Sequence, residues 1–150
     1  MSNDDRVEHR KANSQSRVLV VDDEASNREL ITDMLASEGY DVVTAQDGLE
    51  ALIQLAVPLP DVIISDLKMP RMSGVEFLAV VRRRYPDLPL IAISGEFEGN
   101  EVPPGVPADA YLEKGAFSFN QLRTKITDLL SASSRTQPII GFVAVSASEV

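Results

Sequence analysis

The sequence of 150 residues contains no cysteine and only one histidine, His9. Without cysteine there can be no disulfide framework, no thiolate metal site and no cysteine nucleophile. The lone histidine stands in a polar N-terminal stretch, which disfavours a histidine metal centre or a Ser-His-Asp triad. No apolar run approaches the length of a membrane span, and the N-terminus lacks the apolar region of a signal peptide. These absences predict a cytoplasmic protein that does not enter membranes.

Basic residues are also in the minority. Lys and Arg number 14 against 23 Asp and Glu, so the formal net charge is −9. Proteins that bind the phosphate backbone of nucleic acids need a clustered positive face, so direct binding to nucleic acid is not expected. The apolar fraction of 44% is ordinary for a globular domain. We predict a disordered leader over 1–16, one domain over 17–131, and a tail over 132–150 whose apolar run 137–145 could cover an apolar patch.

Short apolar runs alternate with longer helical patterns from Arg17 onward. Strands are predicted over 17–22, 41–45, 61–66, 88–94 and 109–115, and helices over 25–39, 46–56, 74–86 and 117–130. The helix over 46–56 is expected to turn Leu49, Leu52, Ile53 and Ala56 towards the core. Such alternation is typical of an α/β fold, in which a doubly wound parallel sheet of five strands carries helices on both faces.

The alternation breaks at residues 95–108. This segment stands where a fourth helix is due, but it contains three glycines and three prolines and no helical stripe. Glycine adds backbone freedom and proline removes backbone donors, so both oppose a helix. We expect an irregular loop or at most one helical turn, so the fourth helix of the fold is short or irregular.

Polar side chains follow the ends of four predicted strands. Asp22, Asp23 and Glu24 stand at the end of the first, Asp66 ends the third, Ser94 ends the fourth and Lys114 stands at the end of the fifth. In open parallel sheets these ends meet at one edge, where ligands bind. Carboxylates this close repel one another unless a cation neutralises them, and oxygen-only acidic sites suit Mg²⁺. A lysine and a hydroxyl beside them would hold an anion, so the edge is suited to a phosphoryl group.

Four segments together resemble the receiver domain of two-component response regulators, over about residues 17–130. They are VLVVDDE, DVIISDLKMPRMSG, IAIS and YLEK, in this order along the chain. The resemblance implies a flavodoxin-like sheet with strand order 2-1-3-4-5. It also implies a signalling domain whose only catalysis is its own Mg²⁺-dependent phosphorylation and dephosphorylation.

The resemblance implies a role for each residue at the acidic edge. Asp66 would be the phospho-accepting carboxylate. Asp23, Asp66 and the backbone carbonyl of Lys68 would be direct Mg²⁺ ligands, and Asp22 would act through metal-bound water.

The other side of the site is implied to carry the switch. Ser94 would be the hydroxyl that moves to the phosphoryl oxygen, and Tyr111 the aromatic residue whose ring turns inward when Ser94 moves. Lys114 would pair with the phosphoryl group. Gly115 departs from the family, which usually has proline there, so the aim of the lysine is less preset.

Three alternatives remain open at this stage. The pair Asp22-Asp23 could simply cap the following helix. The domain could be a pseudo-receiver that binds partners without phosphorylation. It could also be a Mg²⁺-dependent phosphohydrolase, although Asp66-Leu67-Lys68 lacks the second acid that such enzymes usually place on the nucleophile's strand. The leading hypothesis is a receiver that takes a phosphoryl group from a histidine kinase or phosphotransfer protein and acts on a downstream protein.

Overall fold

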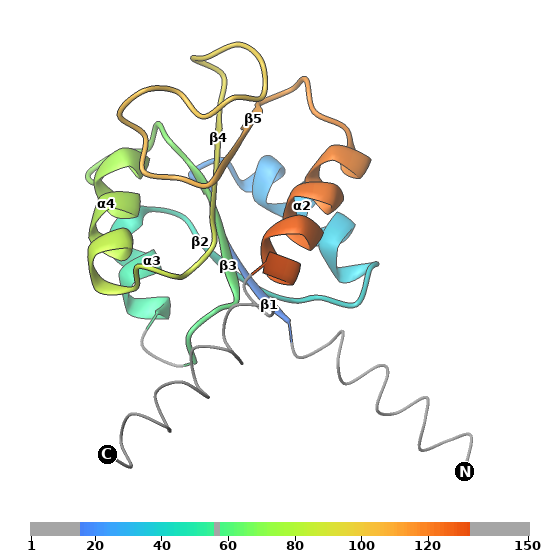
Figure 1. Ribbon diagram of the computed structural model, residues 1–150. Coiled ribbons are helices and arrows are strands. Elements are labelled where there is room, and N and C mark those ends of the chain that lie inside the picture. The colour runs from blue at the N-terminus through green and yellow to red at the C-terminus, as the bar shows by residue number, and fades with distance from the viewer. Residues whose placement is uncertain (1–15, 56–57, 133–150) are drawn as a thin grey trace, which may run out of the picture.

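The computed structural model describes residues 16–55 and 58–132, in which strands and helices alternate (Figure 1). In chain order the elements are β1 (Arg17–Val21), α2 (Ala25–Ala36), β2 (Asp41–Ala45), α3 (Gly48–Gln54), β3 (Val62–Asp66), α4 (Gly74–Arg84), β4 (Leu90–Ser94) and β5 (Ala110–Glu113). A last helix, the C-terminal helix, covers residues 119–132. The predicted elements are all present, with bounds that differ by a few residues.

The strands form one parallel sheet in the order β2-β1-β3-β4-β5. Leu19 in β1 lies opposite Val43 in β2 and Ile63 in β3, which makes β1 an interior strand. Every residue of β3 and β4 is buried, as expected for strands covered on both faces. The predicted doubly wound, flavodoxin-like fold is therefore confirmed.

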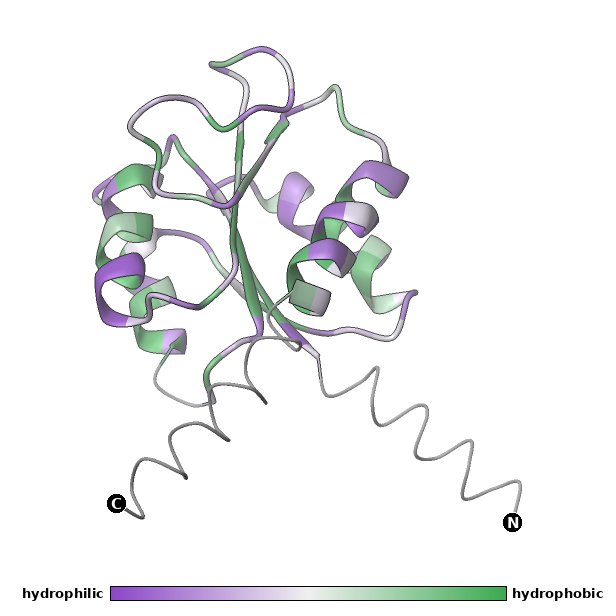
Figure 2. Ribbon diagram, in the orientation of Figure 1, coloured by the Kyte–Doolittle hydropathy of each residue, from purple (hydrophilic) through white to green (hydrophobic). Residues whose placement is uncertain are grey.

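Two hydrophobic clusters sandwich the sheet. On one face α3 and α4 cover a cluster that includes Phe77, Leu78 and Val81. On the other face α2 and the C-terminal helix cover a second cluster with Leu35 and Ile126. Figure 2 shows the central strands hydrophobic along their length, between the two helical layers. This packing fixes the strand ends that carry the polar residues.

Side chains cap three of the helices. Asp47 accepts a hydrogen bond from the Glu50 amide at the start of α3. Ser73 and Glu76 form a reciprocal capping box at the start of α4. The Ser118 hydroxyl accepts from the Gln121 amide before the C-terminal helix. Each contact satisfies an amide that the first helical turn leaves without a partner.

The predicted inward face of α3 was wrong. Leu49 and Ile53 are exposed, Ile53 to 74%, whereas Ala51 and Leu55 are buried and Leu52 is partly buried. Apolar residues occupy most positions of this short helix, so their spacing does not define one face. The Asp47 cap and the packing on the sheet select the stripe of Ala51 and Leu55 instead.

The segment between β4 and β5 contains no helix, as predicted. Its loop rises above the sheet in Figure 1. Val102, Val106 and Ala108 pack against the cluster under α3 and α4. The loop therefore takes over part of the covering role of the missing helix.

Some predictions concern residues outside the described ranges. These are the leader up to residue 15, the inward placement of Ala56, and the covering role of the run 137–145. Among the described helices, none is long and apolar enough to cross a membrane.

Candidate functional site

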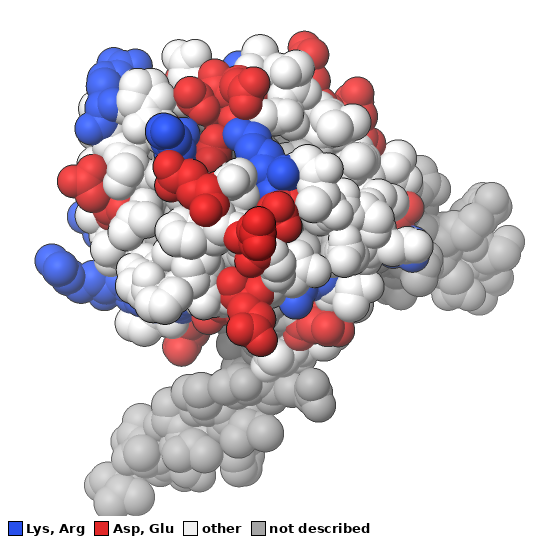
Figure 3. All heavy atoms as spheres, turned by 90° about the horizontal axis from the view of Figure 1, so that it is seen from above, with Lys and Arg blue, Asp and Glu red and all other residues white. Residues whose placement is uncertain are grey.

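The carboxyl ends of the strands form an acidic edge. Viewed from above, this face carries a band of acidic side chains with basic side chains among them (Figure 3). A hollow of about 350 Å³ opens there. It is lined by Asp23, Glu24, Asp66, Lys68, Ser94, Gly95, Glu96 and Lys114. The sheet therefore brings the polar strand-end residues to one place, as the sequence predicts.

Three carboxylates meet in this hollow. Asp22, Asp23 and Asp66 each offer an oxygen, and these oxygens lie within 4.8 Å of one another. Asp22 and Asp66 are buried, whereas Asp23 is exposed. Burial raises the pKa of Asp22, and the charge of Asp66 adds to the rise although the Glu24 amide opposes it. The three carboxylates repel one another when ionised, and their hard oxygen donors fit Mg²⁺.

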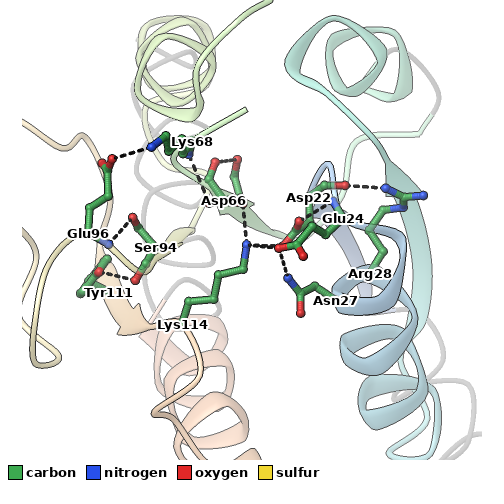
Figure 4. A network of polar contacts seen from close by, with 11 residues as sticks. Asp22, Glu24, Asn27, Arg28, Asp66, Lys68, Ser94, Glu96, Tyr111 and Lys114 are labelled. Atoms are coloured by element: carbon green, nitrogen blue, oxygen red, sulfur yellow. Dashed lines mark hydrogen bonds and ion pairs between the residues drawn. The ribbon is translucent and has the colours of Figure 1, made fainter. Parts of the chain in front are cut away.

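Lys114 supplies a positive charge next to these carboxylates. Its Nζ lies 2.8 Å from Asp66 Oδ2, 3.3 Å from Glu24 Oε1 and 3.4 Å from Asp22 Oδ2 (Figure 4). Burial alone lowers the pKa of Lys114, but the hydrogen bond and charge of Asp66 together with the charge of Asp22 raise it above its ordinary value. The lysine is therefore a permanent cation aimed at Asp66.

The backbone after β5 sets the position of this lysine. The Lys114 amide donates to the Ser94 carbonyl at 2.9 Å. Gly115 follows with a φ of +82°, which the ring of proline does not allow. The departure from the family pattern at this residue is thus a different backbone turn that still places the ammonium beside Asp66.

Ser94 and Tyr111 connect the site to the loop over 95–108. The Ser94 hydroxyl accepts from the Glu96 amide at 3.0 Å. The Tyr111 hydroxyl lies 2.6 Å from the Ser94 carbonyl (Figure 4). It also lies 2.7 Å from the Phe97 carbonyl, and the rings of Tyr111 and Phe97 meet edge to face. Burial raises the pKa of Tyr111. Tyr111 is fully buried, so its ring already lies inward in this structure.

The loop from β3 to α4 forms another wall of the hollow. The Lys68 amide donates to Asp66 Oδ1 at 3.2 Å, and its exposed ammonium lies 3.5 Å from Glu96. Gly74 closes the loop, because a Cβ there would lie 1.9 Å from the Asp66 carbonyl oxygen. Only glycine fits at this point without a shift of the backbone.

The capping alternative for Asp22 and Asp23 is wrong. The residue before the first turn of α2 is Glu24, and its side chain caps no amide of the helix. Asp22 instead accepts from the Glu24 amide at 2.8 Å, outside the helix. Its carbonyl accepts from Arg28 at 2.6 Å. The sequence predicts no role for Glu24, which directly follows the acidic pair, or for Arg28.

Fold and site together define a flavodoxin-like α/β domain with a lysine-bearing acidic hollow at the carboxyl edge of its sheet. Residues 18–127 match the family described as "Response regulator receiver domain". The match covers more than half of the chain, so this chain belongs to the receiver domain family of response regulators, which are signalling proteins of two-component systems.

Individual relatives agree with this family. "Response regulator MprA" of Mycobacterium sp. (strain KMS) is 37% identical over 120 residues, which are 79% of this chain and 52% of the relative. The chain spans about half the length of the curated relatives it matches.

Solved structures are similar as well. Response regulator TrrA from Thermotoga maritima, solved in complex with Mg(2+)-BeF, is 35% identical to this chain with a TM-score of 0.69. The match covers 76% of this chain and 98% of the TrrA chain. Chemotaxis protein CheY4 of Vibrio cholerae shares 34% identity with a TM-score of 0.67 over the same shares of each chain.

Proposed function

We propose that this domain accepts a phosphoryl group on Asp66 from a histidine kinase or phosphotransfer protein and so changes its affinity for another protein. The observation that carries the proposal is the setting of Asp66. Its carboxylate belongs to the acidic trio and contacts Lys114 Nζ at 2.8 Å. A nucleophilic carboxylate beside both a candidate cation site and an ammonium suits phosphoryl transfer.

The acidic trio is proposed to hold Mg²⁺. Asp23 and Asp66 would be direct ligands together with the Lys68 carbonyl, and the buried Asp22 would act through a bound water. When bound, the ion supplies positive charge to the oxygens of the transferring group. A similar response regulator was solved in complex with Mg(2+)-BeF, which supports this ligand for the present site.

The transfer step uses the Asp66 carboxylate as nucleophile. One of its oxygens attacks the phosphorus of the donor, the P–N bond to the donor histidine breaks, and the electron pair leaves with the imidazole nitrogen, which then takes up a proton. Lys114 would pair with the phosphoryl oxygens. Gly95 leaves room for them, because a Cβ there would have nothing within 4 Å among the described residues.

The output is proposed to run through Ser94 and Tyr111 into the loop over 95–108. Movement of the Ser94 hydroxyl towards the phosphoryl group would free the Glu96 amide that it now binds. A partner protein would then bind the surface formed by the loop and the C-terminal helix. We place this exchange in the cytoplasm, and the net charge of −9 supports a protein partner over nucleic acid.

The test is phosphorylation by acetyl phosphate with Mg²⁺, measured by intact mass. The wild-type chain should gain one phosphate and Asp66→Asn none, while Asp33→Asn on the exposed side of α2 should be labelled like the wild type. A labelled Asp66→Asn protein would refute the assignment. An unlabelled wild-type chain would indicate the pseudo-receiver alternative, which the complete acid and lysine set does not favour.

Mg²⁺ titration tests the division of roles in the trio. Asp23→Ala should weaken binding more than Asp22→Ala, because a direct ligand contributes more than a group that acts through water. Loss of an outer partner weakens metal sites by about 10–100-fold. Normal affinity in Asp23→Ala with lost affinity in Asp22→Ala would reverse the roles.

A further inference from the structure

The loop from β3 to α4 contains a strained turn at Arg71. Arg71 has a φ of +69° and is the one non-glycine residue with positive φ in the described parts of the chain. The Met72 amide donates to the Pro70 carbonyl at 2.8 Å, across Arg71. A bond from residue i+2 to residue i around a positive φ is a γ-turn of the strained kind, and such strain persists only where surrounding contacts hold it.

An ion pair with α3 holds this turn. Arg71 Nη2 lies 2.6 Å from Asp47 Oδ2. The Asp47 side chain is only 5% exposed although that of Arg71 is 65% exposed. The other Asp47 oxygen accepts from the Glu50 amide at 2.8 Å and so belongs to the N-terminus of α3. Arg71 is therefore tied to a carboxylate whose own position is fixed.

Packing brings the same two segments together beside the ion pair. A Cβ at Gly48 would lie 2.9 Å from Met72 Sδ, so the Met72 side chain rests directly on the first residue of α3. At the other end of the loop, the Gly74 amide donates to the Leu67 carbonyl at 2.9 Å. Lys68 lies between these two anchored ends.

We propose that Arg71, held by Asp47, is a positioning residue for the magnesium site. The ion pair stabilises the turn that directs the loop backbone, and with it the Lys68 carbonyl, towards Asp66. This inference rests on the proposed function for the role of that carbonyl. It adds α3, which contributes no ligand, to the elements that determine Mg²⁺ affinity.

Two substitutions separate the ion pair from other effects. Arg71→Gly keeps a residue that adopts positive φ readily, so the variant loses the guanidinium without added backbone strain. Asp47→Asn keeps an oxygen for the Glu50 amide but loses the charge that faces Arg71. Arg123→Ala is the matched control. Arg123 lies on the C-terminal helix, and the substitution removes its exposed ion pair with Glu38.

The first measurement is Mg²⁺ affinity by titration of the full chain. Arg71→Gly and Asp47→Asn should each bind Mg²⁺ about 10-fold more weakly, at the lower end of the range for outer partners in metal sites. The double variant should lose no more than either single variant, because both remove the same contact. Arg123→Ala should bind like the wild type.

The second measurement is amide hydrogen exchange without metal. Residues 67–72 should exchange faster in both variants, while the strands keep their wild-type protection. A lower melting temperature with unchanged Mg²⁺ affinity would mean a merely structural role and would overturn the inference. If the wild type does not bind Mg²⁺ through Asp23, both the proposed function and this inference are wrong. If the wild type binds Mg²⁺ and both variants bind it equally well, only this inference is wrong.

Discussion

Replacement of Lys114 by methionine tests the charge balance of the site in both directions. Lys114 Nζ contacts carboxylates of Asp66, Asp22 and Glu24 at 2.8, 3.4 and 3.3 Å. Methionine has nearly the same length and fills the same space without the charge. The Lys114→Met variant would leave two buried carboxylates, Asp22 and Asp66, without this cation.

The size of the stability loss follows from the burial of the partners. Removal of one member of a buried ion pair costs about 3–5 kcal/mol. The Lys114 side chain is 23% exposed, so water screens part of its interaction and we expect about 2 kcal/mol. For a domain of this size that lowers the melting temperature by about 8 °C.

Mg²⁺ should reverse most of this loss. Lys114 and the ion would compete for the charge of the same carboxylates. Removal of the Lys114 ammonium should therefore tighten Mg²⁺ binding by about 10-fold, or about 1.4 kcal/mol. A ligand that binds the native state stabilises that state. Saturating Mg²⁺ should therefore reduce the difference in the free energy of unfolding between variant and wild type by about 1.4 kcal/mol. Phosphorylation by acetyl phosphate should still be slower in the variant, since the phosphoryl oxygens lose their ammonium.

The assay is urea denaturation in EDTA and in excess Mg²⁺, with Mg²⁺ titration beside it. Lys125→Met on the C-terminal helix is the control, and its free energy of unfolding should stay within about 0.5 kcal/mol of the wild type. The reasoning is refuted if Lys114→Met is as stable as the wild type in EDTA, or if it binds Mg²⁺ more weakly.

Three further predictions concern single residues. Asp22 has a raised pKa in the folded protein, so its contribution to stability is present below pH 3.8 and is lost as the pH rises through the folded pKa. Asp22→Asn should therefore be more stable than the wild type at pH 7 in EDTA. Urea melts should show that this gain fades towards pH 4. Gly74→Ala should cost about 3 kcal/mol or more by the same assay, because its Cβ would meet the Asp66 carbonyl oxygen. Tyr111→Phe should speed hydrogen exchange over residues 96–99, because it removes the hydroxyl between two loop carbonyls; unchanged exchange would contradict this.

The sequence predicts the sheet and the acidic edge because both depend on local signals. Apolar runs of five or six residues mark the buried strands, and the residues that follow them must meet where parallel strands end. The face of α3 was mispredicted because apolar residues occupy most of its positions, so Leu49 with Ile53 and Ala51 with Leu55 were both possible buried stripes. The contact between Asp47 and Arg71 leaves no local signal, since the two residues are 24 positions apart.

The loop over 95–108 depends on the site more directly than a packed helix would. Ser94 connects the loop to the site. Its hydroxyl accepts from the Glu96 amide, and its carbonyl accepts from the Tyr111 hydroxyl and the Lys114 amide. Amides beyond the first turn of a regular helix are bonded within the helix, whereas the Glu96 amide here depends on the hydroxyl proposed to turn towards the phosphoryl group. That turn would leave the Glu96 amide without its partner while the Tyr111 hydroxyl still binds the Phe97 carbonyl. We therefore expect the change to start at residues 95–96 and to pivot about Tyr111, so that the acidic start of the loop moves and its apolar end stays packed.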